Sequence, residues 1–341
     1  MGDAFPDYGG KVKFFSNTAG TGFKGAVRRA KRLVSVPPNR LVNTAYRKVR
    51  KKLSPETMPF AQAIHIEVTN ACNLKCVMCP RLTMDRKVGY MDRLLFEKIV
   101  SQLAPHHRIL EGVALMGLGE PLLHKELEAF SRIAARAELP NVYTSTNGVL
   151  LTEQRSESLL SQGAFERIII SLDGATKKTF ETIRAGAKFE TVYQNVETFL
   201  RMKKGRRTPT TSLQILLMEE TEGELRDFCD YWVPLLGPSD EILVKEIDTF
   251  GGQVDDRRTD KNREPSPRFA CRQLWRDMSI SWDGWVTVCC KDVLYKLAVG
   301  NADRIPLEEI WRSQKWETIR RLHKQGDYSM VPCDRCKEWY V

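Results

Sequence analysis

The sequence predicts an α/β fold: a partial (β/α)6 barrel of the TIM type, with a basic helical N-terminal arm and a small Cys-rich C-terminal extension. Three observations predict it. Strand-like and helix-like segments alternate six times between residues 62 and 246, cysteines gather in two groups, and the positive charge lies near the N-terminus. A length of 341 residues suits one large α/β domain with a smaller appendage.

The N-terminal arm, residues 1–57, carries thirteen Lys/Arg and three Asp/Glu, which equals the net charge of +10 of the whole chain. Apolar residues recur at helical spacing over 23–34 and 40–53, and a Pro-Pro break separates these segments. We expect two amphipathic helices that pack on the main body. The alternative is a patch for an anionic surface such as a phosphorylated substrate, nucleic acid or lipid headgroups.

The barrel is predicted from alternating periods. Strands are expected at 64–68, 112–116, 141–145, 167–172, 212–218 and 241–246, and helices at 93–103, 125–137, 152–162, 177–184, 192–204 and 222–233. Such an order gives a parallel sheet with helices outside, and places reactive loops at the carboxyl ends of the strands. We expect residues 58–248 to form this core and residues 249–268, rich in Gly, Asp, Arg and Pro, to be a linker.

Nine cysteines are many for a chain without a visible secretory signal or a long apolar run. We therefore expect a cytoplasmic protein, in which clustered thiols indicate metal rather than disulfides. Cys72, Cys76 and Cys79 have the spacing C-x3-C-x2-C directly after a predicted strand. Three thiolates on one loop suit a [4Fe–4S] cluster whose fourth iron stays open for a small chelating molecule. Structural zinc is the weaker alternative, because it needs four ligands.

Residues 69–80 resemble the signature loop of the radical S-adenosylmethionine (SAM) superfamily. Further segments match at strand ends: Gly117-Leu118-Gly119-Glu120-Pro121 resembles the family's Gly-Gly-Glu-Pro motif, and residues 144–148 and 171–174 follow the next two strands. The resemblance implies that the three cysteines bind a SAM-cleaving [4Fe–4S] cluster. It also implies a carbon radical that takes hydrogen from an unactivated C–H bond, and a reducing partner such as flavodoxin or ferredoxin.

The resemblance further assigns roles in SAM binding. Met78 would lie against the adenine. Backbone near the SAM amino group would come from Gly119, Glu120 and Pro121, and polar contacts to the ribose and methionyl groups from Ser145, Asn147, Ser171 and Asp173. Arg184 sits where relatives often place an Arg that pairs with the SAM carboxylate, a bidentate contact that a guanidinium suits. The alternative for Arg184 is an exposed helix residue.

The second group is Cys271, Cys289, Cys333 and Cys336, within a predicted extension of residues 269–341 that includes a hairpin at 282–285 and a helix over 307–324. Four thiols could hold one zinc ion or one cluster. The spacing around Gly284 resembles the SPASM/twitch extension of radical SAM enzymes, which implies a second, auxiliary [4Fe–4S] cluster. Cys290 competes with Cys289 as ligand, and the Gly-x4-Cys spacing favours Cys289.

Three functions compete. In the first, the enzyme takes hydrogen from a carbinol carbon of a small molecule such as a sugar or aminocyclitol, which is sugar-like or phosphorylated. The product is a ketone or an epimer. Cys290 would donate hydrogen in epimerisation, and Asp292 and Lys245 are candidates for proton transfer. The second is a peptide- or protein-modifying maturase. The third, a metal-stabilised nucleic-acid binder, leaves the strand-end motifs unexplained. Cys229 lies in a predicted helix and is expected to be a core residue.

Overall fold

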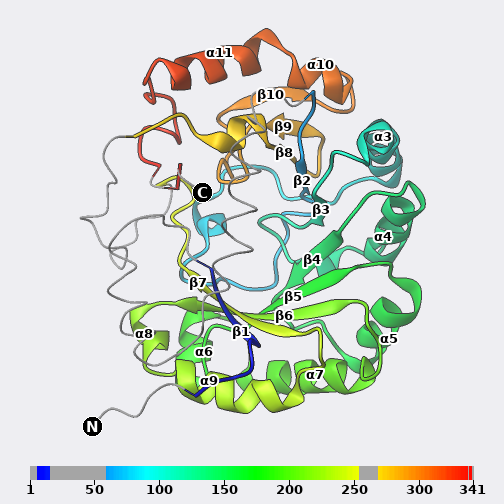
Figure 1. Ribbon diagram of the computed structural model, residues 1–341, viewed down its shortest axis with the longest axis vertical. Helices are drawn as coiled ribbons and strands as arrows, with labels where there is room; N and C mark the ends of the chain where they lie inside the picture. The colour runs from blue at the N-terminus through cyan, green and yellow to red at the C-terminus, as the bar shows by residue number, and fades with distance from the viewer. Residues whose placement is uncertain (1–5, 16–58, 253–267, 337, 340–341) are drawn as a thin grey trace.

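The computed structural model describes residues 6–15, 59–252, 268–336 and 338–339 (Figure 1). Within these ranges, ten strands form one sheet in the order β1-β7-β6-β5-β4-β3-β2-β8-β9-β10. The expected arm helices over 23–34 and 40–53, and most of the expected linker over 249–268, lie outside the described residues.

The six predicted barrel strands are confirmed. They are β2 (Ala63–Ile66), β3 (Gly112–Leu115), β4 (Val142–Thr146), β5 (Arg167–Ser171), β6 (Thr210–Leu217) and β7 (Glu241–Glu246), and neighbours pair in parallel. All four residues of β3 are buried, as are the last four of β5. This burial is typical of a parallel sheet covered on both faces, and it explains the Ile-rich sequence of β5.

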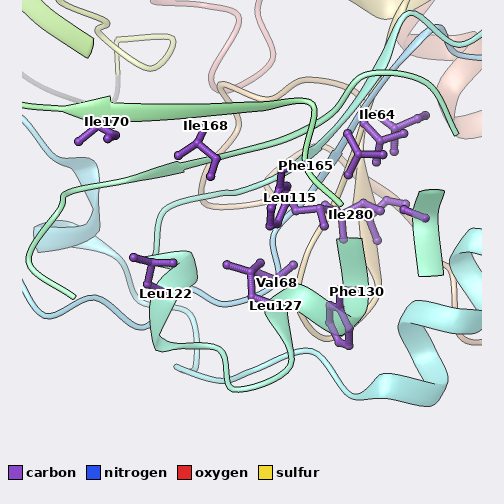
Figure 2. Close-up of a cluster of buried hydrophobic side chains, with 14 of the residues drawn as sticks. Ile64, Val68, Leu115, Leu122, Leu127, Phe130, Phe165, Ile168, Ile170 and Ile280 are labelled. Atoms are coloured by element: carbon purple, nitrogen blue, oxygen red, sulfur yellow. The ribbon is translucent and has the colours of Figure 1, made fainter. Parts of the chain in front are cut away.

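Helices follow the strands along the chain, and Figure 1 shows α4, α5 and α7 on the outer side of the sheet. They are α3 (Arg93–Leu103), α4 (Leu127–Arg136), α5 (Glu153–Gln162), α6 (Lys177–Ile183), α7 (Phe189–Met202), α8 (Glu219–Glu222) and α9 (Leu225–Trp232). The helix expected over 222–233 corresponds to α9, and the short α8, which was not expected, precedes it. Figure 2 shows Leu127 and Phe130 of α4 packed with Leu115 of β3 in the core between helix and sheet.

One strand was not expected. Residues 1–22 were predicted to be a loose or docked extension, and β1 (Val12–Phe15) is docked: it pairs in parallel with β7 and forms one edge of the described sheet. Val12 is buried, and Lys13 Nζ lies 2.5 Å from Glu241 Oε2 of β7. The ion pair between Lys13 and Glu241 places a positive charge of the N-terminal region beside the first residue of β7.

The C-terminal extension continues the barrel sheet. Strand β8 (Asp277–Ile280) pairs in parallel with β2, which places Ser279 opposite His65. The expected hairpin is confirmed: β8 and β9 (Trp285–Thr287) are antiparallel, and Gly284 in the turn has a φ of 85°, a left-handed conformation that favours glycine. Strand β10 (Ala298–Asn301) follows.

The helix expected over 307–324 is divided into α10 (Leu307–Trp311) and α11 (Gln314–Lys324). The division occurs at Ser313, whose hydroxyl accepts a hydrogen bond from Trp316 N (3.3 Å) and caps the second helix. None of the helices in the described ranges has the length and apolar character that crossing a membrane requires.

Replacement of Phe96 by Ala tests the packing that holds the helices on the sheet. Phe96 is fully buried in α3 and stacks on Phe130 of α4, with ring centroids 4.1 Å apart. We expect Phe96→Ala to lower the free energy of unfolding by about 3–5 kcal/mol, because it leaves a cavity. Leu94→Ala, in the same helix at a residue that is 74% exposed, is the matched control and should cost less than about 0.5 kcal/mol. Denaturant titration of both variants measures the difference; equal losses would contradict the packing.

Candidate active site

The first thiol loop lies directly after β2, at the carboxyl edge of the sheet. Cys76 is buried, whereas Cys72 and Cys79 are half-buried. The loop is attached to the end of α6, since Lys75 N donates to Ala185 O (2.9 Å) and Val77 N donates to Ile183 O (3.1 Å). Burial raises the pKa of the Cys72 and Cys79 thiols, so binding of iron there is coupled to proton release.

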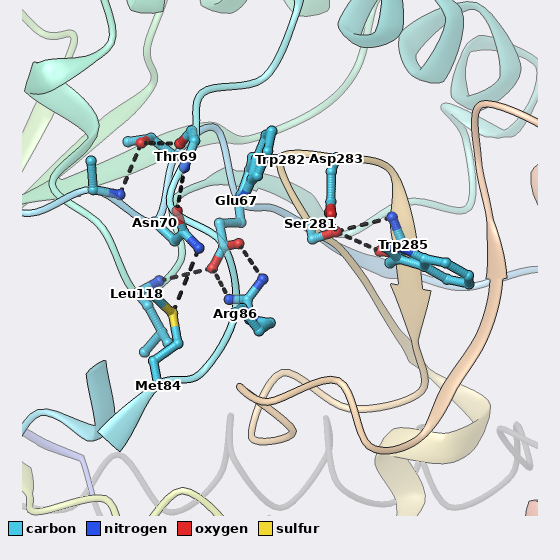
Figure 3. A network of polar contacts seen from close by, with 12 residues as sticks. Glu67, Thr69, Asn70, Met84, Arg86, Leu118, Ser281, Trp282, Asp283 and Trp285 are labelled. Atoms are coloured by element: carbon cyan, nitrogen blue, oxygen red, sulfur yellow. Dashed lines mark hydrogen bonds and ion pairs between the residues drawn. The ribbon is translucent and has the colours of Figure 1, made fainter. Parts of the chain in front are cut away.

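A polar network holds the segment after this loop against it (Figure 3). Arg86 makes two hydrogen bonds of 2.9 Å to the carboxylate of Glu67, a buried residue just after β2. The amide of Asn70 accepts from Gly89 N (2.9 Å) and donates to Lys87 O (2.8 Å). These residues were not predicted to belong to the site. The alternation Ile64-His65-Ile66-Glu67 was the available signal, because it puts His65 and Glu67 on one face of the strand.

The Gly-Glu-Pro motif follows β3, and its backbone contacts the first thiol loop. A Cβ atom on Gly119 would lie 2.3 Å from Thr69 O, so glycine is required there, and Glu120 N donates to Ala71 O (2.8 Å). The buried carboxylate of Glu120 accepts from Thr146 Oγ1 (2.8 Å) and from Asn147 N (2.7 Å). Burial raises the pKa of Glu120. Its side chain therefore ties the end of β4 to the end of β3.

Arg184 is buried against the first thiol loop, and the alternative of an exposed helix residue is wrong. Its Nη1 donates to Cys76 Sγ (3.7 Å), and its guanidinium forms an ion pair with Asp173, which also accepts from Leu216 N (2.7 Å). Its Nε has no hydrogen-bond partner among the residues that the structure describes. Asn147 reaches the same loop, where its Nδ2 donates to Asn73 Oδ1 (2.9 Å). Four of the predicted SAM residues, Gly119, Glu120, Asn147 and Arg184, thus contact the first thiol loop, and the individual roles of all of them remain predictions.

A cavity of about 470 Å³ lies inside the curved sheet, between the strand-end motifs and the C-terminal extension. We call it the main cavity; its volume is typical of small-molecule sites. Six predicted site residues line it, namely Ser145, Ser171, Lys245, Cys289, Cys290 and Asp292. So do polar residues that the sequence analysis missed: His65, Glu67, Tyr143, Arg167 and Gln214. Their positions on alternate residues of predicted strands were the only signal for them.

The second thiol group encloses a separate, small cavity. Cys271, Cys289, Cys333 and Cys336 all line it, so the structure groups Cys289 rather than Cys290 with the other three thiols. Cys289 lines both cavities, whereas Cys290 lines only the main one.

Backbone amides support the sulfur atoms of this second group. Lys291 N donates to Cys289 Sγ (3.3 Å), and Glu338 N donates to Cys336 Sγ (3.4 Å). Burial raises the pKa of Cys271, Cys333 and Cys336, that of Cys333 to about 12. Four thiols with amide donors, gathered around one space, fit a fully ligated iron–sulfur cluster, because hydrogen bonds to the sulfurs accompany such ligands.

The three proposed catalytic side chains differ in surroundings. Cys290 Sγ, a ring nitrogen of His65 and a carboxylate oxygen of Asp277 all lie within 4.8 Å of one another. Burial, with the nearby Lys291 and Arg276, lowers the pKa of His65 to about 4, which leaves the imidazole neutral. Burial also lowers the pKa of Lys245.

Asp292 is committed to hydrogen bonds. Its carboxylate accepts from Thr287 Oγ1 (2.6 Å), Leu297 N (2.8 Å) and Lys296 N (2.9 Å), and it thereby shapes the loop that presents Cys290. Its suggested part in proton transfer remains a prediction. Cys229 is fully buried in α9 and does not line the main cavity, which confirms it as a core residue.

Comparison with known families agrees with this geometry. The Radical SAM superfamily model matches residues 66–231, and the SPASM iron-sulfur cluster-binding domain model matches residues 271–337. The chain belongs to the radical SAM superfamily. Membership implies a [4Fe–4S] cluster and SAM, and the SPASM domain implies auxiliary iron–sulfur clusters. The donor sets fit these groups: three thiols at a strand-end loop, and four around the second cavity.

Among curated proteins, this radical SAM enzyme is similar to the S-adenosyl-L-methionine-dependent 2-deoxy-scyllo-inosamine dehydrogenase of Niallia circulans. The two are 25% identical over 268 residues, which is 77% of this chain and 87% of the relative. Two other curated relatives are matched over only 34% and 43% of their own lengths.

Two solved structures share the fold. The crystal structure of BtrN in complex with AdoMet and 2-DOIA has a TM-score of 0.55 and 21% identity; the match covers 82% of this chain and 93% of BtrN. Streptococcus suis SuiB bound to its precursor peptide SuiA has a TM-score of 0.64 and 14% identity, over 94% of this chain and 83% of SuiB. At these identities the similarity shows the fold and leaves the substrate open.

The adjacent cysteines provide a matched test of the second cluster site. We expect Cys289→Ala to lower the iron bound per anaerobically reconstituted chain by about half, because one of two [4Fe–4S] clusters loses a ligand. Cys290→Ala should bind as much iron as the unsubstituted protein. Iron analysis with Mössbauer spectroscopy measures both. The reverse pattern would identify Cys290 as the ligand.

Proposed function

We propose that this radical SAM enzyme takes a hydrogen atom from a carbinol C–H bond of a small polar molecule, such as a sugar or an aminocyclitol, and acts as an oxidoreductase or an epimerase. The observation that carries the proposal is the main cavity, which is lined both by Ser145 and Ser171 of the SAM motifs and by Cys290 of the C-terminal extension. Similarity to a curated dehydrogenase of 2-deoxy-scyllo-inosamine supports a substrate of this class.

When bound, the first cluster and SAM supply a hydrogen-atom acceptor, and the auxiliary cluster supplies a one-electron acceptor. The chain's own residues bind the substrate, orient it and exclude water. The polar lining from β2, β4, β5 and β6, namely His65, Tyr143, Ser171 and Gln214, offers hydrogen bonds to several hydroxyl groups at once. Several such contacts would fix which carbon faces the reacting position.

Epimerisation needs a hydrogen donor on the far side of the substrate, and Cys290 is our candidate. Its S–H bond breaks, a C–H bond forms on the opposite face of the substrate carbon, and a sulfur radical remains. One electron and one proton then restore the thiol, and a cytoplasmic flavodoxin or ferredoxin would supply the electron. Cys290 is suited to this role because it lines the main cavity and lies outside the four-thiol group.

Dehydrogenation needs no hydrogen donor. The substrate radical loses one electron and its hydroxyl proton, and a ketone results. The four-thiol group adjoins the main cavity through Cys289, which supports an electron acceptor at that place. Lys245 and Asp292 are the predicted proton acceptors. The two routes consume the same substrate and differ in product, so one experiment separates them.

Turnover in deuterated water tests the proposal. The reconstituted, reduced enzyme is incubated with SAM and a panel of sugars, sugar phosphates, sugar acids and aminocyclitols, and 5′-deoxyadenosine and products are analysed by mass spectrometry. Deuterium in an unoxidised product indicates epimerisation, whereas a product oxidised by two electrons, with stoichiometric loss of SAM, indicates dehydrogenation. If no panel member stimulates 5′-deoxyadenosine formation, the proposal is wrong.

Replacement of Cys290 separates the two routes at the residue level. If the enzyme is an epimerase, Cys290→Ala should still form 5′-deoxyadenosine from the active substrate but should lose more than about 90% of the deuterated epimer, because the hydrogen donor is absent. Cys229→Ala removes a thiol that does not line the main cavity and should leave both products unchanged. Full epimer formation by Cys290→Ala would exclude this thiol as the donor.

A further inference from the structure

The charged groups that line the main cavity are unequally compensated. The acidic groups all have partners. Glu67 is held by Arg86 through two hydrogen bonds of 2.9 Å. Glu241 pairs with Lys13 at 2.5 Å and accepts from Ser212 Oγ (2.8 Å). The third acid, Asp292, accepts three hydrogen bonds from its own loop. The acids of the wall are therefore neutralised or bonded without any substrate.

The positively charged side chains that line the same cavity differ in whether they have an ion-pair partner. Lys291 forms an ion pair with Asp248. By contrast, the side chains of Arg167 and Lys245 have no ion pair or hydrogen bond with any residue in the described ranges. The guanidinium carbon of Arg167 lies over the Tyr143 ring, 4.6 Å from its centroid, and the buried Nε of Arg167 has no hydrogen-bond partner among the described residues. Two positive side chains thus line the main cavity without an ion-pair partner in the described ranges.

The two cations come from nearby strands. Arg167 begins β5 and Lys245 lies in β7, and β6, which separates them, contributes Gln214 to the same wall. Burial lowers the pKa of Lys245; Cys290 and Asp173 act in the opposite direction, and the charge of Arg167 lowers the pKa further. Unpaired charge removed from bulk water is costly, and a bound anion would offset this cost.

We propose that the main cavity binds an anionic group of the substrate, a carboxylate or a phosphate, between the guanidinium of Arg167 and the ammonium of Lys245. The inference rests on the proposed function in one respect, because that function makes the main cavity the substrate site. It narrows the substrate class to acidic or phosphorylated polyols. A planar guanidinium can bind two oxygens of either group at once. An anion here keeps Lys245 protonated, which leaves Asp292 as the predicted proton acceptor of the ketone route.

Direct anion binding tests this inference without turnover. The holoenzyme, reconstituted with both clusters and saturated with SAM so that the SAM carboxylate is already accommodated, is titrated with inorganic phosphate and, separately, with acetate. Calorimetry and the thermal unfolding midpoint report binding. We expect saturable binding of phosphate or of acetate, and the preferred anion indicates a phosphorylated or a carboxylated substrate.

Variants locate the bound anion. Arg167→Gln and Lys245→Gln should each weaken the binding by about tenfold or more, whereas Arg167→Lys should retain most of it, because it keeps the charge. Arg207→Gln is the matched control: Arg207 is an exposed cation in a separate basic groove formed by residues 197–207 and 234–240. Iron content and circular dichroism confirm that each variant is folded. Because two positions are substituted separately, the test remains possible if one variant does not fold.

Two results would overturn the inference. One is that neither anion binds saturably; the other is that binding survives Arg167→Gln and Lys245→Gln and is lost in Arg207→Gln. The outcome is separate from that of the proposed function. Anion binding at Arg167 and Lys245 without carbinol turnover would count against the proposed function alone. Turnover of a neutral polyol, together with no anion binding, would count against this inference alone.

Discussion

The parallel pairing of β8 with β2 is the constraint on which the site depends. Because β8 continues the barrel sheet, the C-terminal extension shares the barrel's core, where Ile280 packs with Ile64 (Figure 2). Strand β2 leads into the first thiol loop, and the β8–β9 hairpin leads to Cys289 and Cys290. One strand pair therefore fixes both thiol groups relative to the main cavity, and consecutive residues serve different cavities: Cys289 joins the four-thiol group and Cys290 faces the main cavity.

Local compensation of charge explains how so polar an interior is maintained. Buried ionised groups are tolerated where a partner and hydrogen bonds satisfy them. Glu67 has Arg86, Asp173 has Arg184, and Glu120 has the amides and hydroxyl at the ends of β3 and β4. These contacts also position the backbone of the loops around the first three cysteines. Arg167 and Lys245 of the main cavity differ from this pattern, because they have no ion-pair partner in the described ranges, and exceptions of this kind are typical of functional sites.

Much of this arrangement could be predicted from the sequence, because it is local. The strand and helix periods, the cysteine spacings and the turn at Gly284 each depend on a few neighbouring residues. Long-range pairing could not be predicted: the docking of β1 on β7 and of β8 on β2 depends on hydrogen bonds between distant segments. Likewise, alternation could place Arg167 on one face of a strand, but only the structure shows which charges it faces. The burial of Arg184 against Cys76 is a further long-range contact of this kind.

The most direct test of the account is an iron anomalous map from crystals of the anaerobically reconstituted enzyme. The account expects two iron peaks on either side of the main cavity. One would be held by Cys72, Cys76 and Cys79, and the other by Cys271, Cys289, Cys333 and Cys336, with the Cys290 sulfur free and facing the cavity between them. A single peak, or iron bound to Cys290, would contradict the account, because the substrate site would then not lie between two clusters.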